Sequence, residues 1–180
     1  QLRSYSLIVI GHQGLDVPRH FLTSADERHL SEAVKGGTGL VSFDGLVAGW
    51  KGGRAQPLYD FTQEALRLRF GAPEKAATIK VGAASAAGAE TPGKHYITAM
   101  GPARTVTLKR EITVPGVIPD SSTMVLARAG TQPLLLAGTC GRGRTVLWTS
   151  YAWTKPDVKG KVYGLDDLIW RSLVWAARKP

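Results

Sequence analysis

Two short apolar runs near the start of the chain are separated by a single amphipathic segment. They read Ser-Leu-Ile-Val-Ile at 6–10 and Gly-Leu-Val-Ser-Phe at 39–43. Continuous apolar runs of this length are typical of strands buried on both faces, as in a parallel sheet. Between them, Ser24 and Glu27 fit a capping box that opens a helix, and a pair of glycines fits its end. This order predicts a parallel strand–helix–strand unit.

A second helix is predicted after the second run. Pro57 suits the first turn of a helix, and Gly71 with the proline that follows marks its end. The apolar residues between them recur at helical spacing: Leu58, Phe61, Ala65 and Leu68. Strand, helix, strand and helix in succession predict an α/β fold with a parallel sheet.

The second half of the chain is predicted to consist mainly of strands. Residues 78–82 fit one strand, and four later segments run apolar or alternate between Gly and Pro turns. These segments are 105–114, 124–129, 134–137 and 145–150. They predict an antiparallel meander, followed by a final helix that begins near Asp166. Trp170, Val174 and Trp175 widen the apolar arc of that helix, so we expect it to be largely buried.

The composition is that of an ordinary globular protein, with 43% hydrophobic and 21% charged residues. No stretch is long and apolar enough to span a bilayer. The chain enters a predicted strand at once and stops just after a helix, so we expect 1–180 to be one domain of a larger protein. The single cysteine, Cys140, excludes an internal disulfide framework and a cysteine-based zinc cluster. No metal-ligand spacing occurs, and no cofactor is expected.

The formal net charge of +9 raises the question of a polyanionic partner. Arg and Lys are scattered along the chain, and aromatic residues do not interleave with them as on a base-stacking platform. A basic, solvated surface explains the charge better than a nucleic-acid site. Binding of an acidic glycan or an anionic surface stays open as an alternative, and salt would weaken it.

Several motifs in a shared order resemble the class I glutamine-amidotransferase-like superfamily, and most of all its ThuA-like branch. They are the glycine-rich turn 36–41, His95-Tyr-Ile-Thr98, Gly141–Arg144 with the strand after it, and the closing helix with Trp175-Ala176. The resemblance covers roughly residues 6 to 178. It implies a flavodoxin-like three-layer sandwich, with a mostly parallel central sheet and an antiparallel C-terminal extension. The usual first strand and helix of the superfamily are missing before Ser6.

The chain departs from the family pattern where the chemistry would lie. Phe43-Asp44-Gly45 stands where amidotransferases have a cysteine nucleophile and ThuA-like proteins often have histidine. Tyr96 replaces the proline of the small His motif, and Tyr151 replaces a histidine after the late strand. The resemblance therefore implies a non-catalytic accessory domain of a carbohydrate-active bacterial protein. It would pack against neighbouring domains, oligomerise or bind a glycan. The carbohydrate association also suggests export to the periplasm or the extracellular space.

The alternative is a sugar-directed hydrolase or isomerase built on Asp44, His12 and His95. Asp44 follows the second run, at the end of a strand where open α/β sheets bind ligands. His12 follows the first run, and His95 carries the family's small motif. A carboxylate and two imidazoles that converge could perform acid–base chemistry. The plainer interpretations are an Asp-Gly turn and structural histidines.

Ligand-binding residues are also predicted near the late strand. Tyr151 and Trp153 could stack on sugar rings, but covering a sheet edge explains them better. Arg142 lies in a Gly-Arg-Gly-Arg segment that resembles an anion-binding loop, but a tight turn explains it better because it precedes a strand. Glu111 fits a surface ion pair. Cys140 fits a plain turn cysteine, since nothing near it in sequence would activate a thiolate.

Overall fold

The computed structural model describes residues 2–11, 22–43, 50–51, 54–55, 61, 64–65, 68–82, 95–99, 104–154, 158 and 165–177, and the structural statements below concern these residues. One seven-stranded sheet has the order β1-β2-β9-β8-β7-β5-β6. Its strands are β1 (Leu7–Ile10), β2 (Gly39–Phe43), β5 (Leu68–Val81), β6 (Arg104–Pro119), β7 (Met124–Ala129), β8 (Gln132–Cys140) and β9 (Gly143–Trp148). The other elements are η1 (Leu2–Ser4), α1 (Ser24–Lys35), β3 (Trp50–Lys51), β4 (Arg54–Ala55), η2 (Ala152–Thr154) and α3 (Leu165–Ala177).

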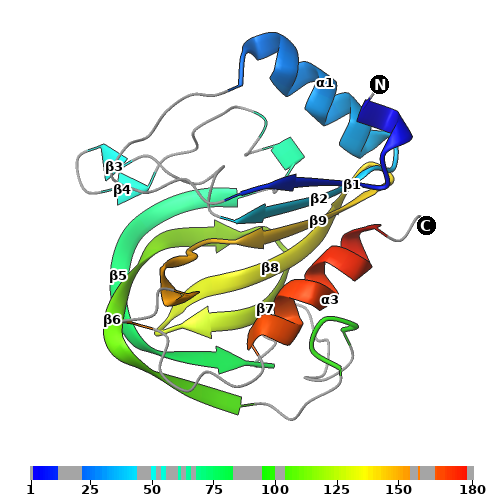
Figure 1. Cartoon of the computed structure of the whole chain (residues 1–180). Helices are drawn as coiled ribbons and strands as arrows, with labels where there is room; N and C mark the ends of the chain where they lie inside the picture. The colour runs from blue at the N-terminus through cyan, green and yellow to red at the C-terminus, as the bar shows by residue number, and fades with distance from the viewer. Residues whose placement is uncertain are drawn as a thin grey trace.

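The predicted α/β class is confirmed, but the expectation of a mostly parallel sheet is wrong. Only the β1–β2 and β2–β9 pairs are parallel, whereas β9–β8, β8–β7, β7–β5 and β5–β6 are antiparallel. β9 joins the parallel part of the sheet to the antiparallel part, because it pairs with β2 on one side and with β8 on the other. Figure 1 shows β5 and β6 as long, strongly curved strands that form the far end of the sheet.

The helix predicted from Pro57 to Gly71 is only partly correct. Phe61, Glu64 and Ala65 are helical, but Leu68 already pairs with Pro119 as the first residue of β5. Gly71 lies within β5, and a register shift after it accommodates the next residues. Leu68 has the right spacing for a helix, yet pairing with β6 holds it in a strand, so tertiary context overrides local periodicity.

The first helix was expected in the right place but with its cap one residue late. Thr23 is the N-cap: its Oγ1 accepts a hydrogen bond from the amide of Asp26 at 3.2 Å. The Asp26 carboxylate accepts in return from the Thr23 amide at 2.9 Å. This is a capping box formed by Thr23 and Asp26, in place of the predicted Ser24 and Glu27. The helix ends at Lys35 before Gly36, as expected.

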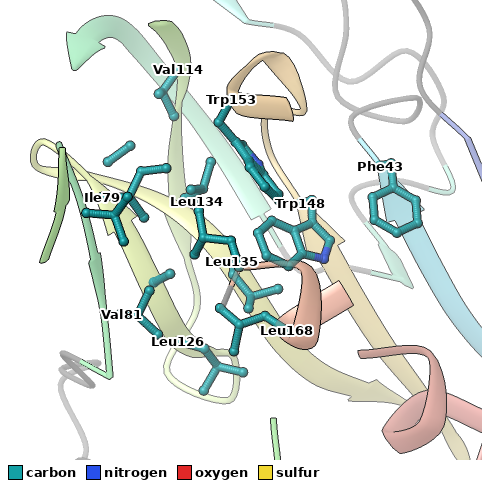
Figure 2. Close-up of a cluster of buried hydrophobic side chains, with 14 of the residues drawn as sticks. Phe43, Ile79, Val81, Val114, Leu126, Leu134, Leu135, Trp148, Trp153 and Leu168 are labelled. Carbon is teal, nitrogen blue, oxygen red and sulfur yellow. The ribbon is translucent and has the colours of Figure 1, made fainter. Parts of the chain in front are cut away.

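The sheet separates two cores, one under each helix (Figure 1). On the α1 side, Leu30 and Val34 pack with residues of β2, β8 and β9. On the α3 side, Leu165, Leu168 and Ala176 pack with a larger cluster, part of which Figure 2 shows around Trp148 and Trp153. None of the helices in the described part of the chain is long and apolar enough to cross a membrane.

Two expectations of burial are corrected by this arrangement. β1 is the last strand at one side of the described sheet, and Val9 is 49% exposed, so this strand is not buried on both faces. On α3 the buried residues are Leu165, Leu168, Ser172 and Ala176, whereas Trp170 points away from them and is 67% exposed. By contrast, α3 packs so closely on β2 that a Cβ on Gly39 would lie 2.1 Å from the Ala176 carbonyl oxygen.

Candidate functional site

The carboxyl ends of β2 and β9 lie together and are covered by aromatic side chains. Phe43 ends β2 and pairs in register with Trp148, which ends β9. The chain after β9 returns over this edge, so that the Tyr151 ring meets Phe43 edge-on with 5.1 Å between centroids. The ring centroid of Trp153 lies 5.8 Å from that of Tyr151 and 5.3 Å from that of Trp148. We call Phe43, Trp148, Tyr151 and Trp153 the aromatic cluster (Figure 2 labels all but Tyr151).

The backbone after β9 is held against the sheet by buried hydroxyl groups. Thr149 is fully buried, and its Oγ1 donates to the Pro133 carbonyl at 2.7 Å. Ser150 is also fully buried and donates to the Thr113 carbonyl at 3.5 Å. These bonds attach the segment to β8 and β6, and they engage the hydroxyl groups nearest the end of β9. Within the described residues, the indole N–H groups of Trp148 and Trp153 are buried without an acceptor.

Two of the three predicted catalytic residues, Asp44 and His12, lie outside the described residues. The strands that lead to them are described. β2 ends at Phe43, and Ile10 at the end of β1 pairs with Ser42, so both strands point to the same edge. A pairing of the Asp44 and His12 side chains therefore stays a prediction.

His95 lies at the other end of the parallel strands. Its ring packs on Trp175 near the end of α3, with 4.8 Å between centroids. The Arg144 guanidinium lies 5.2 Å from the centroid of the same indole ring and donates to the Trp175 carbonyl at 3.1 Å. Arg144 is near the start of β9, whereas the Phe43–Trp148 pair is at its end. The structure thus groups His95 with Trp175 and Arg144.

The environment of His95 favours the neutral imidazole. Its Nδ1 accepts a hydrogen bond from the Ile97 amide at 3.2 Å, which leaves the proton on Nε2. Burial, with a smaller contribution from the Arg144 cation, lowers the pKa of His95 to about 4. The Nε2 atom is buried and has no acceptor among the described residues. At neutral pH this side chain is a structural ring that carries no charge.

The predicted ligand-binding residues have different surroundings. Trp153 is completely buried, so its ring does not present the free face that stacking on a sugar needs. Tyr151 is half-buried in the aromatic cluster. Arg142 is exposed, but its Nη2 donates to the Gly36 carbonyl at 2.9 Å and its amide donates to the Lys35 carbonyl at 3.0 Å. Both acceptors lie at the end of α1, where helix carbonyls lack partners.

The turn around Arg142 agrees with its plainer interpretation. Cys140 and Gly143 form the last pair between β8 and β9, and Gly141 has a φ of +60° in the turn between them. Cys140 is buried and not part of a disulfide. Glu111 is exposed on β6 and forms no ion pair with another residue in the described part of the chain. Within the described ranges, no three His, Cys, Asp or Glu side chains gather as a metal site would require.

Known proteins match this chain in structure and not in sequence. No protein-family model matches it, and neither does any curated protein sequence. A cytoplasmic protein from Salmonella typhimurium LT2 superposes with a TM-score of 0.64 at 18% identity, over 98% of this chain and 74% of that protein. A protein described as ThuA-like from Bacteroides uniformis superposes with a TM-score of 0.59 at 13% identity, over 98% of this chain and 70% of that one.

The chain has a ThuA-like fold. Identities this low carry the fold alone, and they support the ThuA-like fold that the order of the short motifs implied, although not its mostly parallel sheet. A second ThuA-like structure, from Parabacteroides merdae, superposes with a TM-score of 0.51. The expectation of export is contradicted, because the Salmonella typhimurium LT2 protein is described as cytoplasmic, as is a second protein from Salmonella typhimurium that superposes with a TM-score of 0.64 at 18% identity.

Sequence reasoning missed two groupings around this ThuA-like sheet. One is the contact of His95 with Trp175 and Arg144, which come from three distant parts of the chain. The other is the mutual packing of the aromatic cluster across β2, β9 and η2. Only the crowding of Trp148, Tyr151 and Trp153 in the sequence hinted at the second grouping. The residues of neither grouping follow a fixed spacing in the sequence that could have predicted their contact.

Proposed function

We propose that this chain is a non-catalytic ThuA-like domain that serves a larger, carbohydrate-active bacterial protein by packing against a neighbouring domain. The observation that carries the proposal is the aromatic cluster at the carboxyl ends of β2 and β9. Open α/β sheets bind ligands at this edge. Here the side chains nearest the ends of both strands pack on one another, and the hydroxyl groups beside them bond to backbone carbonyls.

The replaced family residues support the same conclusion. Phe43-Asp44-Gly45 has no cysteine or histidine, and Tyr151 stands where the family pattern has a histidine. His95 keeps its place in the motif but packs at the opposite end of β9, where it is neutral. Among packing, oligomerisation and glycan binding, the burial of Trp153 favours packing over glycan binding. The Salmonella neighbours are described as cytoplasmic, and we place this function in that compartment.

A substrate panel tests the proposal against the enzymatic alternative. The purified chain is assayed on nitrophenyl glycosides and unmodified disaccharides, next to the variants Asp44→Asn and His12→Gln. Asp167→Asn, an exposed carboxylate on α3, is the matched control. We expect the four proteins to be indistinguishable from buffer. Turnover that falls at least about tenfold in Asp44→Asn and persists in Asp167→Asn would overturn the proposal.

A further inference from the structure

The two sides of the described sheet differ in how their outer backbone is protected. β6, on one side, carries Lys109, Arg110 and Glu111 and contains two prolines. Its pairing with β5 has two register shifts, and the Lys109 amide donates to the Val158 carbonyl. Charges, prolines and bulges are the devices by which proteins prevent a sheet from adding strands. β1, on the other side, reads Leu-Ile-Val-Ile and has none of them.

Within the described residues, no strand pairs with the outer backbone of β1, which is thus available for a regular ladder. The Gly39 amide donates to the Ser6 carbonyl at 3.0 Å, and Leu7 is in register with Gly39. In a parallel pair, residues alternate between facing the partner strand and facing away from it. Ser6, Ile8 and Ile10 therefore bond to β2, whereas Leu7 and Val9 direct their N–H and C=O groups outward. No other described strand pairs with them.

Apolar surface lies on both faces of the sheet beside this backbone. On the α1 side, a groove of about 620 Å³ runs along β1. Leu2, Ile8, Ile10, Leu22 and Leu30 line its apolar part, and Arg3, Asp26, His29 and Glu32 of η1 and α1 line the rest. Val9, on the α3 side, is 49% exposed, and Tyr5, just before the strand, is 59% exposed. β2, which has a strand on each side, is buried at every residue. β1 has the composition of such an inner strand with the exposure of an outer one.

We propose that β1 is a docking site for an extended apolar strand of a neighbouring domain, which adds to the sheet beside Leu7 and Val9. The inference rests on the proposed packing function and names its interface. β1 itself carries no charge, so the residues of a complementary strand that lie beside it are apolar, as in an inner parallel strand. One face of that strand fills the groove, and the other covers Val9.

A second copy of this chain fits the site less well than a foreign strand. A two-fold axis through β1 would place two identical grooves next to each other. Ile8 and Ile10 already line the groove of their own copy, so neither copy supplies a side chain to fill the other. A foreign strand brings new side chains to this space and continues the parallel ladder of β1, β2 and β9.

A peptide in trans tests the proposal with the intact chain. The probe is a labelled peptide of sequence Lys-Thr-Val-Ile-Val-Leu-Val-Thr-Lys, and the control peptide has proline in place of the central valine. Val9→Pro removes an outward N–H and leaves pairing with β2 intact, since Val9 does not bond to β2. Val9→Thr keeps the β-branched shape and the N–H. Val9→Lys serves as a second variant should Val9→Pro lose its thermal unfolding transition.

Binding is measured by fluorescence anisotropy, and hydrogen exchange locates it. We expect the peptide to protect the Leu7 and Val9 amides, and Val9→Pro or Val9→Lys to weaken binding at least about tenfold while Val9→Thr retains it. Absence of binding, equal binding to Val9→Pro, or protection elsewhere would overturn the proposal. The proposal would also be overturned if the chain without peptide formed a dimer and Val9→Pro dissociated it. That result would assign the site to a second copy of the chain. These outcomes leave the substrate panel unaffected, so failure of the docking site and failure of the proposed function are distinguishable.

Discussion

At the scale of single residues, His95 shows how a short motif can be kept in sequence and used for packing. Its imidazole lies on Trp175 beside Arg144, and its Nδ1 accepts from the Ile97 amide. Protonation would break that hydrogen bond and place a second cation near Arg144. Burial, and to a smaller extent the Arg144 cation, lowers the pKa of His95 to about 4.

This pKa predicts a specific loss of stability in acid. The unfolded chain binds a proton near pH 6.5 and the folded chain only near pH 4, so the free energy of unfolding falls as the pH drops through this window. The upper bound is about 3 kcal/mol, and partial exposure of the ring reduces it. Urea unfolding at pH 7 and pH 4.5 measures the effect. We expect His95→Gln to lose less stability than the wild type over this range.

The control for this prediction is His29→Gln, because His29 is exposed on α1. Its pH dependence should follow that of the wild type. If His95→Gln and the wild type lose the same stability between the two pH values, His95 does not carry the effect.

At the scale of elements, α1 shows that a helix is predicted more readily than its boundary. Thr23-Ser24 offers two hydroxyl residues, and either could form a capping box with the acidic pair Asp26-Glu27. The extended backbone of Thr23, with φ −82° and ψ 164°, selects the earlier pair. The direction in which the chain enters the helix decides which residue becomes the N-cap, and this direction depends on how α1 packs on the sheet.

The choice of cap predicts unequal effects of two neighbouring substitutions. Thr23→Ala should lower the free energy of unfolding by about 1 kcal/mol, because the Asp26 amide loses its acceptor. Ser24→Ala, one residue later inside the helix, should change it by less than about 0.5 kcal/mol. Denaturant titrations of both variants measure the difference. The reverse order of effects would identify Ser24 as the cap.

At the scale of the whole molecule, η2 and α3 together close the larger core. Trp153 brings η2 onto Trp148 and Tyr151, while α3 covers β2 and β9. Segments after the last strand thus complete a core that begins with β2. Tryptophans in these two segments have opposite surroundings, since Trp153 is fully buried and Trp170 is 67% exposed.

This contrast predicts the outcome of a matched pair of substitutions. Trp153→Ala should cost about 3–5 kcal/mol of unfolding free energy, because it removes buried contacts and leaves a cavity. Trp170→Ala should cost less than about 1 kcal/mol. Thermal and urea unfolding measure both values. Similar costs for the two variants would contradict the position assigned to η2.

Local signals in the sequence were enough to locate α1, α3 and most of the strands, since apolar periodicity, caps and glycine turns act over a few residues. The ThuA-like fold also followed from the order of short motifs. The tertiary structure alone decided which strands pair: it joined β9 to both β2 and β8, moved Leu68 into a strand and left β1 at the side of the sheet. It also placed His95 beside Trp175. Such pairings are non-local, because their free energy comes from residues far apart in the chain that no spacing encodes.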